Sequence, residues 1–483
     1  MSNYIVDGSD LTSVANAIRA KSGGSSQLAF PAGFVSEIGN IPTGGGGGDD
    51  GKPVKLIDYD GTVLHSYTAA EFAALTALPA NPTHTGLTAQ GWNWTLANAK
   101  TYVASYGTLT IGQTYNTSDG KTRFYLSMQP DALTVSFTAS QSLTGNLDWG
   151  DGSIESGASS TMTHTYAAAG DYVVVINGDA YSSAITLSGS TSAGFRQALT
   201  KAEIGNKVII TDIFQDCTSL TSVTIPSSVT SISNYAFQYC ASLTSVTLPS
   251  GVTSTGNFTF QYCTSLTSVT LPSSVTSIGS GAFQYCASLT SITIPSSVTK
   301  ILNYAFQYCT SLTSVTIPSS VTTIGDYAFQ YCTSLTSVTL LSRATSIGSS
   351  VFYYCTSLTS VTIPSGVTSI GSSAFQYCTS LTSVTIPSSV TSISSYAFRY
   401  CASLTSITIP SSVTSIGSSA LNSIYSASAL VFKPSSPPTA GSSAFANLPK
   451  DCVIHVPAGS LAAYTSASNY PSSSTYTYVE DPA

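Results

Sequence analysis

Charged residues are scarce in this chain of 483 residues: Asp, Glu, Lys and Arg together make up 8% of it. Soluble domains usually carry about 25%, so hydroxyl and amide groups must solvate this surface. The 15 basic residues are outnumbered by 22 acidic ones, which leaves no basic surface for nucleic-acid phosphates. No run approaches the roughly 18 apolar residues of a membrane-spanning helix. These shortages exclude nucleic-acid binding and membrane insertion, and a hydrophobic content of 42% argues against a disordered chain.

A repeat of 23 residues dominates the second half of the chain. Nine cysteines follow one another at this spacing from Cys217 to Cys401, and only Cys452 is out of register. Within a unit, the alternation around Val223 and Ile225 predicts a short strand that ends at the following proline. Each unit can bury its apolar side chains only against its neighbours, so the units must stack into a solenoid with one parallel strand per coil.

The repeated phrase, Leu-x-x-Val-x-Ile-Pro, then Ile-Gly, then Ala-Phe-x-x-Cys, resembles the BspA-like class of leucine-rich repeats on cell surfaces. This resemblance implies a mainly β leucine-rich-repeat solenoid, or horseshoe, over residues 193–470. A shortened unit at Leu199 to Gly205 predicts an N-terminal cap. The segment from Val453 to Tyr464 resembles the closing strand and short helix of such solenoids. Residues 471–483 are predicted to form a C-terminal tail.

The cysteine column allows three interpretations. In-register coils place equivalent Cα atoms about 4.8 Å apart, but the parallel Cβ vectors stay wider apart than the roughly 3.5–4.5 Å that a disulfide needs. A zinc site needs four ligands that converge on one point, whereas a ladder runs along a line. Free, buried thiols that pack as small hydrophobic groups are therefore favoured.

The first 51 residues predict a helical module and a linker. Residues 1–43 contain an amphipathic helix, Asp10-Leu-Thr-Ser-Val-Ala-Asn-Ala-Ile-Arg-Ala-Lys, which ends at Gly23-Gly24. That phrase, followed by Phe30-Pro-Ala-Gly-Phe-Val-Ser, resembles N-terminal segments of tail-associated proteins in phages and prophages of gut bacteria, and implies docking onto other virion proteins. Residues 44–51 form a Gly-rich linker.

Residues 52–128 predict a small α+β module. The phrase around Asp58 and Asp60 matches the nucleophile motif of haloacid-dehalogenase-type phosphatases, but the segment is too short for that fold. The same letters predict a hairpin of two strands, Val54 to Tyr59 and Thr62 to Tyr67, joined at Asp60-Gly61. A capping box predicts a helix from Thr68 to Leu75, and a second helix is expected at about 95–106. Trp92 and Trp94 are expected to fill a small core, with sugar binding as the alternative.

Residues 129–192 alternate apolar and polar residues as a β-sandwich does. The phrases Asp148-Trp-Gly-Asp-Gly, His164-Thr-Tyr and Gly170-Asp-Tyr resemble a PKD-type immunoglobulin-like domain, which implies a spacer on a surface protein. Asp148 and Asp151 could hold Ca²⁺, but a structural turn is favoured. No histidine has a Cys or Ser partner in a nucleophile-like pattern. We therefore expect no enzyme activity, no metal and no cofactor.

This order of modules predicts a phage virion protein, of the tail-fibre or attachment kind, that binds a host surface glycan or protein. The first residues do not resemble a signal peptide, which favours assembly in the host cytoplasm. The turn before each cysteine carries a tyrosine and a glutamine, which suit sugar stacking and hydrogen bonding; the alternative is a packing ladder between coils. The expected contact residues are Tyr239, Tyr262, Tyr285, Tyr308, Tyr331, Tyr354, Tyr377 and Tyr400, with Gln238, Gln261, Gln284, Gln307 and Gln330.

Two other functions remain open from the sequence. A bacterial cell-surface adhesin could carry the same repeats. An ice-binding solenoid could present the Ser-x-Thr rows of the strands, although the curvature of a horseshoe argues against it. A homo-oligomer is also left open.

Overall fold

The computed structural model describes only part of the first third of the chain and nearly all of the rest. The described residues are 52, 54–57, 63–79, 87–92, 100, 103–104, 109–117, 121–140, 146–156, 160–176, 185–188, 193–205, 208–340 and 343–482. The chain divides into two compact units, Met1–Lys121 and Thr122–Ala483, and each is considered by itself. The predicted helical module 1–43, the linker 44–51, Asp58, Asp60 and Trp94 lie outside the described residues.

The first unit contains a four-stranded sheet in the order β2-β1-β4-β3. Its elements are β1 (Val54–Ile57), β2 (Val63–Tyr67), α3 (Ala69–Ala74), β3 (Leu87–Trp92) and β4 (Leu109–Thr117). β1 and β2 pair antiparallel, as the predicted hairpin requires. The capping box is also confirmed, because the Thr68 side chain accepts from the Glu71 N–H and the Glu71 side chain accepts from the Thr68 N–H. Phe72 of α3 is buried against Val54 and Leu56. The predicted helix at 95–106 lies mostly outside the described residues.

The second unit begins with two sheets, in the orders β14-β12-β5-β10-β7-β8 and β13-β11-β6-β9. The strands before the repeats, with the one helix among them, are β5 (Thr122–Met128), β6 (Thr134–Ala139), β7 (Asn146–Asp148), β8 (Ile154–Ser156), β9 (Thr161–Thr165), β10 (Gly170–Ile176), β11 (Ile185–Ser188), α5 (Ala193–Ala198), β12 (Leu199–Glu203) and β13 (Val208–Ile210). The rings of Phe124 on β5 and Phe137 on β6 lie 5.5 Å apart and join the sheets. The resemblance of this region to a PKD-type domain stays a prediction.

One predicted boundary differs from the structure here, and the predicted N-terminal cap is confirmed. β5 lies within the predicted 52–128 module, but it pairs with β10 and with β12, so the units divide before Thr122. β12 is the first strand of a shortened coil, as predicted, because Ile210 bridges in parallel to Ile232 and the Phe214 ring stacks on Phe237, as in the coils that follow. It pairs antiparallel with β5 and parallel with β14 (Ser222–Thr224) of the first coil. The sheet therefore continues into the solenoid, and β12 covers the edge of β14 that would otherwise be exposed at the first coil.

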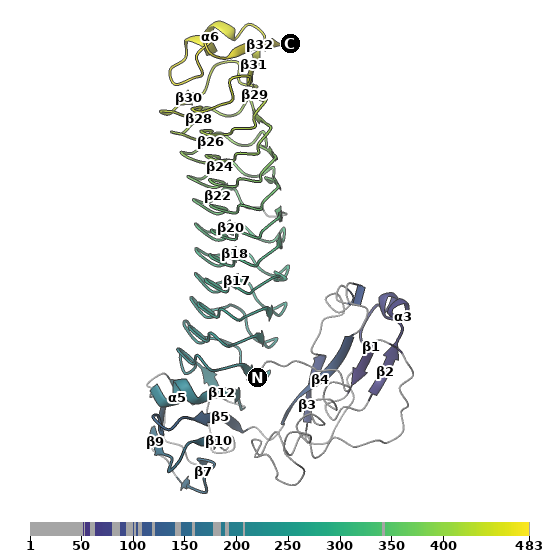
Figure 1. Ribbon diagram of the computed structural model, residues 1–483, viewed down its shortest axis with the longest axis vertical. Helices are drawn as coiled ribbons and strands as arrows, with labels where there is room; N and C mark the ends of the chain where they lie inside the picture. Colours follow the sequence, from purple (N-terminus) through teal and green to yellow (C-terminus); the bar gives the residue numbers. More distant parts are fainter. Residues whose placement is uncertain are drawn as a thin grey trace, which may run out of the picture. The chain divides into compact units, whose positions relative to one another are not determined.

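Each coil of the solenoid contributes to two columns of parallel strands rather than to the single column predicted (Figure 1). The first column holds β14, β15 (Ser245–Thr247), β16 (Ser268–Thr270), β19 (Ser314–Ile317), β21 (Ser337–Leu340), β23 (Ser360–Thr362), β25 (Ser383–Thr385), β27 (Ser406–Ile409), β29 (Ala429–Phe432) and β31 (Val453–Pro457). The second holds β17 (Ser277–Ile278), β18 (Lys300–Ile301), β20 (Thr323–Ile324), β22 (Ser346–Ile347), β24 (Ser369–Ile370), β26 (Ser392–Ile393), β28 (Ser415–Ile416) and β30 (Thr439–Ala440). The second column arises because the chain resumes alternation after each proline turn: Lys300 is exposed and Ile301 is buried.

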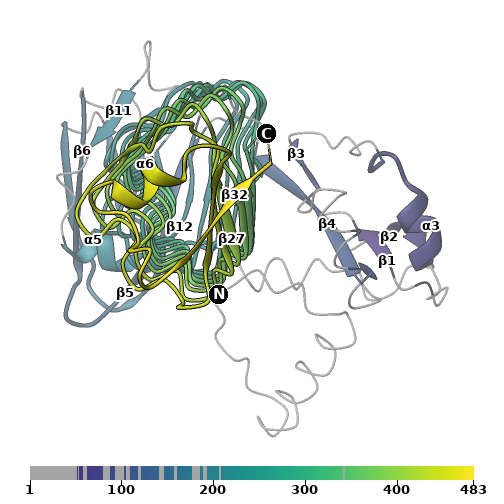
Figure 2. The ribbon, with the colours of Figure 1, turned by 90° about the horizontal axis from the view of Figure 1, so that it is seen from above.

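The coils keep the register of the repeat and stack in a nearly straight column. Val315 pairs with Val338, 23 residues later. Viewed along the column, successive coils nearly superimpose (Figure 2), so the predicted horseshoe curvature is not observed. A horseshoe bends where one side of the coil is wider than the other. Here stacked phenylalanines are spaced 5.2–5.7 Å and stacked tyrosines 4.4–5.1 Å, close to the spacing of hydrogen-bonded strands on the other sides.

The C-terminal end is closed as predicted by a strand and a short helix. β31 is followed by α6 (Leu461–Ser466), whose Tyr464 is fully buried and donates from its hydroxyl to the Pro434 carbonyl. The last residues are not a separate tail, because β32 (Thr477–Asp481) pairs in parallel with β31. None of the helices in the described part of the chain is long and apolar enough to cross a membrane.

Candidate ligand-binding face

The third side of each coil is a turn with two residues in the left-handed backbone conformation. In one coil these are Tyr235 and Tyr239, with φ of 62° and 61°. A residue other than glycine loses roughly 1–2 kcal/mol in this conformation. Hydrogen bonds to the next coil offset that cost: the Tyr235 N–H donates to the Asn257 carbonyl at 2.9 Å, and the Tyr239 N–H to the Gln261 carbonyl at 2.8 Å. The turn therefore places side chains at two fixed points in every coil.

The predicted tyrosine column lies at the second of these points. Its eight rings stack from coil to coil, from Tyr239 to Tyr400, with centroids 4.4–5.1 Å apart. The planes of the first five rings differ by only 5–7° up to Tyr331. Most ring faces are thus covered by neighbouring rings. The middle of the column offers a ligand ring edges and phenol hydroxyls rather than open aromatic faces.

The predicted glutamines form a second ladder beside the rings. The Gln215 Nε2 donates to the Gln238 Oε1 at 2.7 Å, and the same bond repeats from each glutamine to the next. The linked residues are Gln238, Gln261, Gln284, Gln307 and Gln330. Gln307 is 9% exposed. These amides therefore donate to and accept from one another, as the packing alternative requires. The accessible groups of the face are the tyrosines.

Sequence reasoning missed a second aromatic column, four residues before the first. It contains Tyr235, Phe258, Tyr304, Tyr327 and Tyr396, all in the left-handed conformation. Tyr396 has no aromatic neighbour in its column, where Ser373 and Ser419 occupy the adjacent coils, and it is 38% exposed. The same period of 23 residues could have revealed these positions. Their residue types vary too much to draw attention without the backbone conformation.

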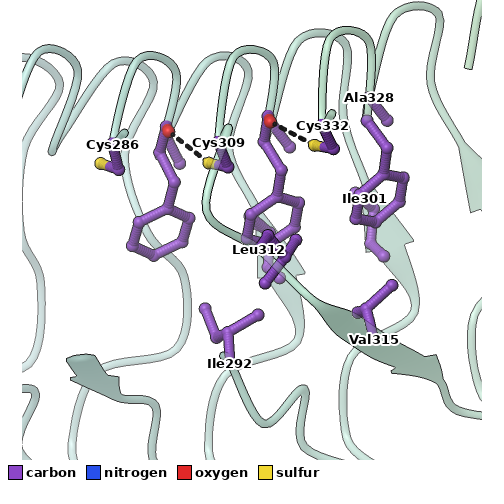
Figure 3. Close-up of a cluster of buried hydrophobic side chains, with 14 of the residues drawn as sticks. Cys286, Ile292, Ile301, Cys309, Leu312, Val315, Ala328 and Cys332 are labelled. Carbon is purple, nitrogen blue, oxygen red and sulfur yellow. Dashed lines mark hydrogen bonds between the residues drawn. The ribbon is translucent and has the colours of Figure 1, made fainter. Parts of the chain in front are cut away.

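The cysteines line the inside of the turn as free, buried thiols, which confirms the favoured interpretation. Cys286, Cys309 and Cys332 lie in one row (Figure 3). The Cys309 Sγ donates to the Phe283 carbonyl at 3.1 Å, and Cys332 makes the equivalent bond to Phe306 at 3.2 Å. Burial raises the pKa of the Cys309 thiol well above its ordinary value, so these thiols are unreactive packing groups.

The two aspartates considered for calcium are engaged in turns. The Asp148 Oδ1 accepts from the Gly150 N–H at 2.8 Å, and the Asp151 Oδ1 accepts from the Ser153 N–H at 2.9 Å. The other Asp151 oxygen lies 2.7 Å from the His164 Nε2. This geometry matches the structural turn that the sequence favoured. In the described residues, no group of three or more His, Cys, Asp and Glu side chains could hold a metal ion.

The Ser-x-Thr rows of the strands are exposed, as Ser245 and Thr247 of β15 show on either side of the buried Val246. A separate threonine row, just before the second column of strands, is occupied by bonds between coils. The Thr276 Oγ1 donates to the Thr253 carbonyl of the preceding coil at 3.1 Å, and Thr299 repeats this bond to Thr276. The straight column removes the curvature argument against ice binding, so a thermal hysteresis measurement remains the test of that alternative.

Comparison with known proteins identifies the repeats. The family described as "BspA type Leucine rich repeat region" matches residues 196–313 and 299–428. No curated protein matches the chain. A leucine-rich repeat protein from Bacteroides ovatus is 25% identical, over 59% of this chain and 88% of that one, with a TM-score of 0.32. A leucine rich cell surface protein from Faecalibacterium prausnitzii is 28% identical, over 59% of this chain and 91% of that one, with a TM-score of 0.34. The T. pallidum leucine rich repeat protein is 29% identical, over 38% and 84%, with a TM-score of 0.31. The repeat region of this chain thus consists of BspA-type leucine-rich repeats that form a β-solenoid.

Proposed function

We propose that this chain is an adhesion protein of a bacterial cell surface, and that its solenoid binds polysaccharide on the turn face. The observation that carries the proposal is the pair of tyrosine columns on a face almost without charge. From Thr218 to Ala420, only Lys300, Asp326, Arg343 and Arg399 are charged. Such a face offers aromatic groups and hydroxyls, which match the apolar faces and hydroxyls of sugars.

Sugar stacking is expected where a ring is not covered by its neighbours. Tyr239 is the first ring of its column and Tyr235 the first of the other; each is 41% exposed. Tyr396 stands alone in its column and is 38% exposed. These three rings are therefore the expected stacking points, and the covered middle of the first column supplies hydroxyl contacts.

Binding of the full chain to immobilised polysaccharides tests this proposal. Tyr396→Ser and Tyr239→Asn should weaken binding without unfolding the chain, because Ser373 and Asn447 hold the same left-handed positions in other coils. Failure of the unaltered chain to bind any polysaccharide or bacterial surface would overturn the proposal.

A triple substitution separates packing from binding in the middle of the column. Tyr285→Ala, Tyr308→Ala and Tyr331→Ala together remove rings stacked 4.5 Å apart. We expect the combined variant to lower the thermal midpoint while Tyr396-dependent binding persists below it. Loss of binding with an unchanged midpoint would instead place the ligand on the middle of the column.

Whether the solenoid is displayed on a cell surface or on a virion is tested separately. BspA-type repeats over residues 196–428 support a cell surface, because the class that they resemble is found there. The virion role stays a prediction from residues 1–43. The cell-surface location would be overturned in favour of the virion if the chain were detected in purified phage particles and lost from them on deletion of residues 1–43.

A further inference from the structure

One coil carries an arginine where the glutamine ladder would continue. Arg399 lies 23 residues after Gln376, between the two left-handed residues of its turn, Tyr396 and Tyr400. Its Cζ lies 5.5 Å from the centre of the Tyr396 ring and 4.8 Å from that of Tyr400. The turn thus brackets a guanidinium between two aromatic rings, an arrangement that favours a cation.

The described coils around Arg399 contain no carboxylate side chain that could pair with its guanidinium. Asp326, about three coils earlier, is the only carboxylate side chain from Thr218 to Ala420, and Asp451 follows more than two coils later. The Nε of Arg399 is buried and has no hydrogen-bond partner. A buried donor left in this state lowers the stability of the fold, and more so when it is charged. The rings, not a polar group, therefore position this side chain.

We propose that Arg399, with Tyr396 and Tyr400, binds the carboxylate of an acidic sugar in a surface polysaccharide. The planar guanidinium matches a carboxylate through paired hydrogen bonds. The exposed ring of Tyr396 lies beside it to stack on the sugar that bears that carboxylate. This inference rests on the proposed polysaccharide-binding function and names the chemical class of the ligand.

An acidic peptide fits this place less well. A peptide would also need partners for its backbone, but the N–H groups of the turn are used between coils. The Tyr377 N–H donates to the Arg399 carbonyl at 2.9 Å, and the Tyr400 N–H donates to the Asn422 carbonyl at 3.0 Å. A sugar needs only the ring and the guanidinium.

Three other coils provide the internal control. They carry tyrosines at both left-handed positions and a glutamine between them: Tyr235, Gln238 and Tyr239; Tyr304, Gln307 and Tyr308; Tyr327, Gln330 and Tyr331. Arg399→Gln therefore gives this coil a bracket that already folds elsewhere in the solenoid, and it removes only the guanidinium.

The test measures binding of the full chain to polygalacturonate, to neutral dextran and to polyglutamate. We expect the unaltered chain to prefer polygalacturonate, and Arg399→Gln to weaken that binding roughly 10- to 100-fold, the effect of one lost charged hydrogen-bonded contact. Dextran binding should be unchanged by the substitution. Added salt should weaken only the polygalacturonate binding.

A second variant moves the site. Arg399→Gln combined with Gln330→Arg places a guanidinium between Tyr327 and Tyr331, and it should restore part of the lost affinity. Gln330 accepts from Gln307 and is followed one coil later by Tyr353, so the exchange breaks only the last bond of that ladder. Absence of any recovery would overturn the role of the bracket.

The outcomes separate this inference from the function on which it rests. Equal polygalacturonate binding by Arg399→Gln and the unaltered chain overturns the inference, while retained dextran binding preserves the proposed function. Tighter Arg399-dependent binding of polyglutamate than of polygalacturonate would show that the ligand is an acidic peptide, and would also overturn it. Binding to none of the polymers would overturn both.

Discussion

The phenylalanine column gives the sharpest test of how the solenoid is held together. Phe306 is fully buried, and its ring stacks on Phe283 at 5.3 Å and on Phe329 at 5.2 Å. Truncation of a buried phenylalanine to alanine costs about 3–5 kcal/mol. We expect Phe306→Ala to lower the free energy of unfolding by about 4 kcal/mol, because coils held in register by hydrogen bonds on three sides cannot close around the cavity.

A milder substitution at the same position serves as the matched control. Leu421 occupies the equivalent place in a later coil and is fully buried, so the fold accepts leucine there. Phe306→Leu should therefore cost only about 1–2 kcal/mol, the usual range for a core change that keeps most of the volume. Urea denaturation followed by far-ultraviolet circular dichroism measures both values. Equal losses of stability in the two variants would refute this account of the core.

The buried thiols report where the chain opens. Each coil of a solenoid contacts only its neighbours, so the Phe306→Ala defect should open the coils around it first. A loss of about 4 kcal/mol raises the open fraction roughly a thousandfold. Alkylation at neutral pH followed by intact mass spectrometry should then show a few thiols, those of Cys286, Cys309 and Cys332, labelled well before the others. Labelling of all ten thiols in a single step would contradict the local opening.

Two further predictions concern the ends of the second unit. The Lys433 Nζ donates to Asp481 at 3.0 Å, and this bond, with a second one from His455, holds the pKa of the Asp481 carboxyl below its ordinary value. The resulting stability is present above about pH 4 and is lost as the pH falls through the lowered pKa. Asp481→Asn should therefore weaken the pH dependence of the thermal midpoint between about pH 4 and pH 2. At the other end, a Cβ on Gly194 would lie 2.2 Å from the Thr134 carbonyl oxygen; Gly194→Ala should cost about 1–3 kcal/mol in urea denaturation, whereas Gly366→Ala, whose nearest neighbour is 3.8 Å away, should leave stability unchanged.

The repeat made the solenoid predictable, because its 23-residue period determines which residues share a column and shows which columns are apolar. Leu220, Phe237 and Cys240 are fully buried, as the recurring positions indicated. The second strand column was missed because only two residues pair in each coil, Ser277 and Ile278 in one case. Such a short segment carries too little alternation to indicate a strand by itself.

The candidate face was less predictable because its properties arise between coils. The sequence located the tyrosines and glutamines, but not that neighbouring rings cover one another at 4.4 Å or that the amides bond to one another. The left-handed backbone at Tyr396 and Tyr400 could not be expected from a bulky residue type. That conformation creates the bracket around Arg399, so this arginine had no apparent role in the sequence.

The scarcity of charge has a cause in the stacking itself, and a pair of substitutions tests it. A charge repeated in one column would face its copy in the next coil about 5 Å away, as close as Tyr308 is to Tyr331 at 4.5 Å. Two like charges at about 5 Å repel by roughly 1–3 kcal/mol at effective dielectric constants between those of water and of a protein surface. Gln307→Arg and Gln330→Arg should therefore destabilise the chain together by more than the sum of the single substitutions. Added salt should reduce this excess.

The distant pair Gln261→Arg and Gln330→Arg is the control for that double-mutant cycle. These positions lie three coils apart in the same column, beyond the roughly 10 Å over which salt leaves exposed charges coupled, so their effects should add. Additive effects in the neighbouring pair as well would mean that stacking does not select against charge. A coupling confined to neighbours would explain why the three cations and one anion between Thr218 and Ala420 occupy four different positions in the repeat. A neutral face is then the condition for near-identical coils, and the guanidinium of Arg399 stands out on it because no other charge shares its column.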